Sequence, residues 1–116
     1  MHALLAAFRH SLRGLRHALA TERAVRQEAA LLALGVPAGW VLAPTIWVWV
    51  ALVASLLGVL AVELLNTAVE KLCDHVTPDR HPQIAIVKDL GSAAALCAQA
   101  LALLVWAAAS WERLSG

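Results

Sequence analysis

Residues 46 to 62, IWVWVALVASLLGVLAV, carry no charge, and the chain continues without a proline through VELLNTAVEKLCD at 62–74. A helix over 46–74 is about 43 Å long, more than the roughly 30 Å thickness of a bilayer's hydrocarbon core. We therefore expect it to cross a membrane and to emerge at its last turns. The composition agrees, because 61% of the 116 residues are hydrophobic, more than a soluble domain of this size could bury.

Residues 2–19 predict an amphipathic helix. Leu4, Phe8 and Leu12 fall on one side of it, and Arg9 and Arg13 fall on the opposite side. Such a helix lies in the headgroup plane of a membrane. The alternative is an ordinary soluble helix packed on a core, which the apolar remainder of the chain disfavours.

Two more membrane spans are expected, at about 22–43 and 84–111. Thr21 is expected to cap the first of these, and Thr45 to cap the helix at 46–74. A loop is predicted over 75–87. Small residues crowd 91–98, which favours close packing between membrane helices and predicts an oligomer. The predicted fold is an all-α membrane protein in one domain, 1–116, with a surface helix and three transmembrane helices.

The positive charges predict the orientation. Of the nine lysines and arginines, only Arg113 lies beyond the far end of the last span. Because positive charge gathers on the cytoplasmic side, the N-terminus and the 75–87 loop should be cytoplasmic. Trp40, Trp47, Trp49 and Trp111 then form an aromatic belt at the other interface.

A polar stripe ends the span at 46–74. Glu63, Asn66, Glu70 and Asp74 fall on one face of the helix, although Asp74 alone is expected simply to emerge into water. The other two spans begin with polar residues at the same depth: Glu22, Arg26, Gln27, Glu28, Lys88 and Asp89. Carboxylates and an amide suit Mg²⁺, and a lysine suits phosphate. These are the parts of a phosphoryl-transfer site, yet no Walker A motif or glycine-rich kinase loop is present.

Three stretches, GLRHALATERAVRQE (14–28), VELLNTAVEKLCD (62–74) and HPQIAIVKDLGSAAAL (81–96), resemble the prokaryotic integral-membrane diacylglycerol kinases and the related undecaprenol kinases. The resemblance implies ATP-dependent phosphorylation of a membrane lipid alcohol with Mg²⁺, by a homotrimer that shares its active sites between subunits. It also implies a location in the bacterial inner membrane. The stretch KDLGSAA is more similar to the diacylglycerol branch, so diacylglycerol, giving phosphatidic acid, is the expected substrate.

The resemblance also implies residue roles. Glu63 matches the general base that takes the lipid hydroxyl proton, with Asn66 and Asp89 beside it in the catalytic centre. Glu22 and Glu70 match carboxylates of the ATP site that bind the metal. The other matches are ATP contacts, Asp79, Arg80, His81, Lys88 and Asp89, and lipid contacts, Arg26, Gln27, Glu28, Glu63 and Ser92.

Some alternatives stay open. Ala3 stands where the family has an early arginine, and whether Arg9 replaces it is undecided. Undecaprenol is the rival substrate. A small ion-coupled transporter could use Glu63, but transport favours polar groups near mid-membrane, where only Gln99 is expected. A purely structural subunit would leave the clustered polar residues without a role.

Overall fold

The computed structural model describes residues 1–77, 79 and 81–116, and these form four helices. They are α1 (His2–Thr21), α2 (Arg23–Leu42), α3 (Ile46–Val76) and α4 (Pro82–Ser115). No strand occurs in the described part of the chain. The predicted all-α class is confirmed.

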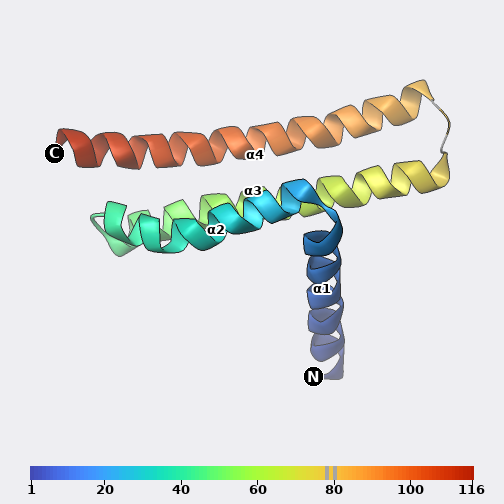
Figure 1. The fold of residues 1–116 in the computed structure, drawn as a ribbon, viewed down its shortest axis with the longest axis horizontal. Helices are drawn as coiled ribbons and strands as arrows, with labels where there is room; N and C mark the ends of the chain where they lie inside the picture. Colours follow the sequence, from blue (N-terminus) through green and yellow to red (C-terminus); the bar gives the residue numbers. More distant parts are fainter. Residues whose placement is uncertain (78, 80) are drawn as a thin grey trace.

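Helix α3 is the centre of the molecule. It packs against α4 on one side and α2 on the other, whereas α2 and α4 hardly touch. Both neighbours run antiparallel to α3, and α1 projects at a steep angle from the start of α2 (Figure 1). The molecule is elongated, with extents of 54 × 40 × 22 Å. The start of α2 and the α3–α4 loop therefore lie toward the same end of the three long helices.

The helix boundaries correct two predictions. Thr21 is the last residue of α1 and does not cap α2: its hydroxyl donates to the backbone oxygen of His17 and to Glu22. Glu22 occupies the N-cap position without a side-chain cap bond. The predicted cap at Thr45 is confirmed, because its Oγ1 accepts a hydrogen bond from Val48 N at 3.3 Å.

The predicted loop at 75–87 is also wrong in extent. Helix α3 continues to Val76, and α4 begins at Pro82. A proline disrupts the interior of a helix, but at a first helical position its missing N–H and fixed φ are compatible with a helix start. His81 is the N-cap, and its Nδ1 accepts from Gln83 N at 3.2 Å. The connection between the two helices is consequently short.

Small residues bring α2 close to α3. Gly39 is buried, and a Cβ there would meet Leu52 and Trp49 at 3.5 Å. Trp49 Nε1 donates to the backbone oxygen of Val36 at 2.9 Å, beside Pro37, which α2 passes through without ending. Close approach and the tryptophan bond together hold α2 along α3.

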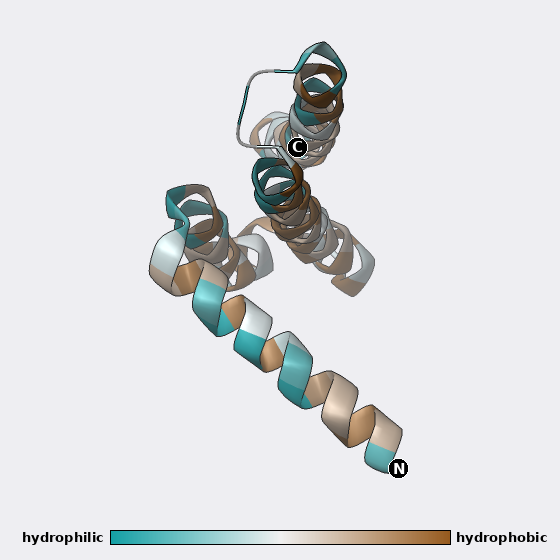
Figure 2. Ribbon diagram, turned by 90° about the vertical axis from the view of Figure 1, so that its right-hand side faces the viewer, coloured by the Kyte–Doolittle hydropathy of each residue, from teal (hydrophilic) through white to brown (hydrophobic). Residues whose placement is uncertain are grey.

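Two helices, α3 and α4, are long and apolar enough to cross a membrane. Helix α2 falls short because its first two turns hold Arg23, Arg26 and Glu28. Large apolar side chains point outward, among them Leu103, which is 72% exposed. Hydrophilic residues gather at the loop end of α3 and α4 and at the start of α2, and the rest of these helices is mostly apolar (Figure 2).

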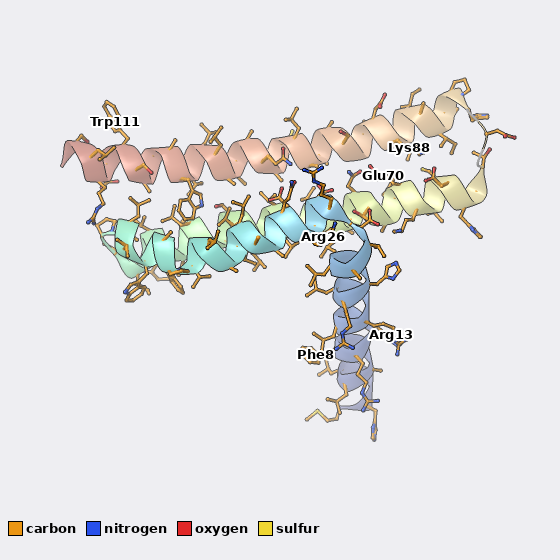
Figure 3. All side chains as sticks on the ribbon, viewed as in Figure 1. Phe8, Arg13, Arg26, Glu70, Lys88 and Trp111 are labelled. Carbon is orange, nitrogen blue, oxygen red and sulfur yellow. The ribbon has the colours of Figure 1, made fainter. Side chains whose placement is uncertain are left out.

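The sidedness of α1 agrees with the predicted surface helix. Phe8 and Arg13 project to different sides of it (Figure 3). Phe8 is 62% exposed and Leu4 is 72% exposed, so these side chains have no cover among the described residues. A lipid surface provides that cover for helices of this type.

Candidate functional site

Asn66 is the buried member of the polar stripe on α3. It is 8% exposed, and its Nδ2 donates to Glu70 Oε1 at 3.4 Å. Its Oδ1 is buried and has no hydrogen-bond partner among the described residues. The amide thus orients Glu70, which is itself exposed on the next turn.

Gly91 of α4 makes room for this amide. A Cβ on Gly91 would overlap Asn66 Oδ1 and lie 3.4 Å from Asn66 Cγ. With Asn66 in this position, a side chain at residue 91 would require the amide or the helix to shift. The KDLGS stretch therefore has a packing role, at Gly91, as well as the phosphate and lipid roles predicted for its neighbours.

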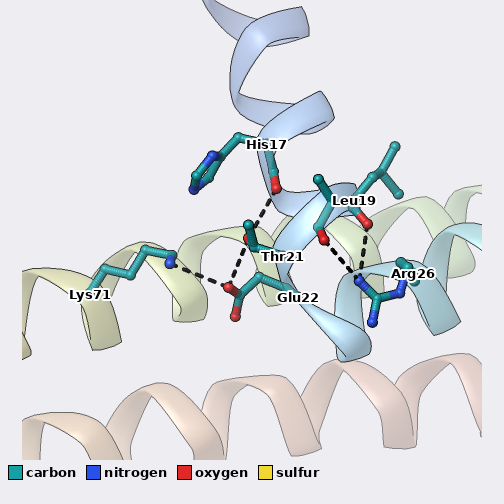
Figure 4. A network of polar contacts seen from close by, with 7 residues as sticks. His17, Leu19, Thr21, Glu22, Arg26 and Lys71 are labelled. Atoms are coloured by element: carbon teal, nitrogen blue, oxygen red, sulfur yellow. Dashed lines mark hydrogen bonds and ion pairs between the residues drawn. The ribbon is translucent and has the colours of Figure 1, made fainter.

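A second cluster joins α1, α2 and α3. Glu22 Oε2 accepts from Thr21 Oγ1 at 3.0 Å and lies 3.3 Å from Lys71 Nζ (Figure 4). The hydrogen bond from Thr21, followed by that from Lys71, holds the pKa of the Glu22 carboxyl below its ordinary value. Arg26 Nη1 donates to the backbone oxygens of Leu19 and Ala20, at 3.2 and 3.3 Å. In this chain Arg26 therefore secures the end of α1.

A third cluster surrounds the α3–α4 connection. Asp79, His81 and Lys88, three predicted ATP contacts, line one cleft of about 560 Å³ together with Asp74 and Thr77. Lys88 Nζ donates to Asp74 Oδ1 at 2.6 Å. Asp74 is exposed, as expected, and its carboxylate also pairs with the lysine of the facing helix. Arg80, also a predicted ATP contact, lies outside the described residues.

Glu63 and Glu28 lie between these clusters. Both are partly buried. Seven of the described site residues that the sequence predicts are exposed: Arg26, Gln27, Glu70, Asp79, His81, Asp89 and Ser92. Figure 3 shows Glu70 and Lys88 toward the loop end and Trp111 at the other end. Glu70 and Lys88 therefore lie on the half of the molecule that holds the loop.

The carboxylates do not form a complete metal site within one chain. Across the described residues, no group of three or more histidine, cysteine, aspartate or glutamate side chains could hold a metal ion. The donor type nevertheless fits Mg²⁺, which proteins commonly bind through one or two carboxylates together with substrate phosphates. Glu22 and Glu70 supply oxygen ligands of that kind.

Comparison with known proteins decides the family. The sequence model described as "Prokaryotic diacylglycerol kinase" matches residues 9–109. The chain belongs to the prokaryotic diacylglycerol kinase family. The chain is 35% identical over 103 residues to the diacylglycerol kinase of Haemophilus influenzae, covering 89% of this chain and 87% of that one. It is also 35% identical, over 103 residues, to the diacylglycerol kinase of Escherichia coli (strain K12), covering 89% of this chain and 84% of that one.

A third member of the diacylglycerol kinase family carries a different name. The undecaprenol kinase of Bacillus subtilis (strain 168) is 32% identical over 90 residues, covering 78% of this chain and 72% of that one. The predicted family, and with it the expected class of lipid kinase, is confirmed.

The structure adds four residues that sequence reasoning missed: Lys71, Asp74, Thr77 and Gly91. Of these, Asp74 could have been inferred, because Asp74 and Lys88 lie on either side of the short connection between α3 and α4.

Proposed function

We propose that this chain transfers the γ-phosphoryl group of ATP to the free hydroxyl of diacylglycerol, giving phosphatidic acid at the cytoplasmic membrane face. One observation carries the proposal. The polar stripe of α3, with Glu63 as its deepest carboxylate, leads along the helix to the cleft that Lys88 lines. A lipid hydroxyl is held near headgroup level, which suits the Glu63 end of the stripe. ATP arrives from water, which suits the cleft that Lys88 lines.

Glu63 acts in this proposal as the general base. It accepts the proton of the lipid hydroxyl as the lipid oxygen forms its bond to the γ-phosphorus, and the bond from that phosphorus to the ADP oxygen breaks. Asn66 acts through Glu70, whose carboxylate it holds. Lys88 supplies positive charge to the phosphates once ATP draws it from Asp74. Asp79, Arg80, His81 and Asp89 complete the proposed nucleotide contacts.

Mg²⁺ is the metal we propose, held by Glu22 and Glu70 together with ATP. When bound, it supplies neutralisation of the phosphate charge that builds up during transfer. On the lipid side, Glu28, Gln27 and Ser92 are the proposed contacts. Arg26 is proposed to act there through the junction that it holds between α1 and α2.

We also propose three membrane spans, formed by α2, α3 and α4. The N-terminus is proposed to be cytoplasmic and the location to be the inner membrane. The antiparallel packing of α2 along α3 supports this, since a helix so placed follows its neighbour through the bilayer. A homotrimer with shared sites is proposed as well. It is supported by the many outward apolar side chains and by carboxylates that do not converge within one chain.

The decisive experiment offers substrates one at a time. Purified protein in mixed micelles receives labelled ATP with Mg²⁺ and either diacylglycerol or undecaprenol. We expect labelled phosphatidic acid to form at the higher kcat/KM. Faster labelling of undecaprenol would favour the second candidate, which the Bacillus subtilis relative supports. Labelling of neither lipid would overturn the proposed activity.

A further inference from the structure

An apolar groove of about 610 Å³ runs between α2 and α4, over α3. Glu28 and Gln99 supply polar groups to it, and Gly35, Leu56, Val59 and Trp106 are among its other lining residues. Glu28 is also a predicted lipid contact, and Val59 lies one helical turn from Glu63 on α3. The groove therefore begins beside the candidate site and extends along the apolar part of the helices.

Contacts between α3 and α4 fix the depth of each lining residue. Gly91 lies beside Asn66, and Trp106 Nε1 donates to the backbone oxygen of Leu52 at 3.1 Å. In this antiparallel register Gln99 is opposite residues 58–59. It is about 6 Å farther from the loop end than Glu63, since a helix rises 1.5 Å per residue.

Trp106 is the groove-lining residue of α4 that lies farthest from the loop end. The Leu52 oxygen that binds its indole is about 16 Å along α3 from Glu63. A Cβ on Gly35 would overlap Leu56 and lie 3.4 Å from the indole, so the three helices meet here. The hydrogen bond and this contact hold the indole in place.

We propose that the groove holds one ester-linked acyl chain of the lipid substrate, that Gln99 donates a hydrogen bond to its ester carbonyl, and that Trp106 limits the depth of the chain. This inference rests on the proposed function. In a diacylglycerol the ester carbonyls lie just below the free hydroxyl, as Gln99 lies just below Glu63. A polyprenol has no ester, so the amide would then face lipid without a partner, which is costly.

The ester contact is tested with Gln99→Leu. Phosphorylation of a diacylglycerol is compared with that of the dialkylglycerol ether of equal chain length. We expect the parent to favour the ester about three- to tenfold in kcat/KM, the value of one net hydrogen bond, and Gln99→Leu to lose that preference. Gln83→Leu is the matched control, because Gln83 is exposed and outside both the groove and the cleft. An ester preference unchanged in Gln99→Leu overturns this part.

The depth limit is tested with Trp106→Ala over a series of acyl lengths. In the parent, KM should fall with length and then level off. In the variant it should continue to fall, by up to about fourfold per added methylene, because each methylene buried is worth about 0.8 kcal/mol. Trp106→Phe, which keeps a ring, should resemble the parent more closely. Trp111→Ala is the control, since Trp111 is exposed and lies away from the groove. A plateau at the same length in Trp106→Ala overturns the limit.

A binding measurement separates this inference from the proposed activity. The fluorescence of Trp106, taken as the difference between parent and Trp106→Phe, is quenched with diacylglycerol brominated near its chain ends. Quenching should exceed that by phosphatidylcholine with the same brominated chains. If diacylglycerol and phosphatidylcholine quench Trp106 equally, bulk lipid fills the groove. If neither lipid quenches Trp106, a second copy of the chain covers the groove. Both results overturn the inference even in an active kinase. Preferential quenching without product would instead refute only the activity.

Discussion

Lys71 Nζ lies 3.3 Å from Glu22 Oε2 and so ties α3 to the junction between α1 and α2. Glu22 is also a proposed Mg²⁺ ligand, so in this chain a lysine holds the oxygen that the metal would need (Figure 4). Ion pairs at a surface contribute only about 0–1 kcal/mol. A divalent cation can therefore displace Lys71 from Glu22 at little cost, although the lysine still weakens binding of the cation.

Lys71→Met tests this competition. With the lysine charge removed, we expect half-maximal phosphorylation at a lower Mg²⁺ concentration, while the melting temperature changes little. Initial rates over a Mg²⁺ series at saturating ATP give the comparison. Arg113→Met, at the opposite end of the molecule, is the control for loss of one positive charge. An unchanged Mg²⁺ requirement in Lys71→Met would argue that Glu22 does not bind the metal.

The same carboxylate should make stability depend on pH. Thr21, and after it Lys71, lower the pKa of Glu22, so folding favours its ionised form. Its contribution is present above the unfolded value of about 4.3 and is lost as pH falls through the lower folded value. Thermal unfolding in detergent between pH 7 and 3 should show a smaller acid-induced loss for Glu22→Gln than for the parent. Glu112→Gln, in the exposed last turn of α4, should behave like the parent.

Gly91 offers a test of the α3–α4 contact. In Gly91→Ala the new Cβ overlaps Asn66 Oδ1, and overpacking of this kind typically costs about 1–3 kcal/mol. We expect a lower melting temperature and a lower rate, since Asn66 also positions Glu70. Gly58→Ala is matched to it, because nothing lies within 4 Å of a Cβ there. That change should be neutral or stabilising, since alanine favours a helix over glycine by up to about 1 kcal/mol. Equal stability of the two variants would show that the contact is unimportant.

How far the sequence could predict this molecule depends on the kind of signal involved. Long apolar runs and the spacing of Glu63, Asn66 and Glu70 depend only on helical periodicity, so the helices and the polar stripe were predictable. The pairs Lys71–Glu22 and Asp74–Lys88 depend on how separate helices meet. The boundary near Pro82 was misplaced because a proline signals both a break and a helix start. Gly91 was noted only as a small residue, since its partner Asn66 lies on another helix.

Topology can be tested by cysteine labelling in a background without Cys73 and Cys97. A cysteine at position 2 or 79 should react with a membrane-impermeant reagent only from the cytoplasmic side, and one at position 116 only from the other side. Three spans require the two termini to lie on opposite sides. If positions 2 and 116 react from the same side, the number of spans is even and α2 does not cross.

Glu63→Gln tests the base itself. The amide keeps the size and much of the hydrogen bonding of the carboxylate but cannot accept the lipid proton. Loss of a general base costs about 10²–10⁴ in rate, so kcat should fall by that factor. ATP affinity should be kept, because the nucleotide cleft is lined by other residues. Stability should hold or rise, since a charge leaves a partly buried position. Glu112→Gln serves again as the matched control and should keep the parent kcat. A near-parent kcat in Glu63→Gln would remove this residue from the chemistry and leave the stripe as a metal-binding and packing surface.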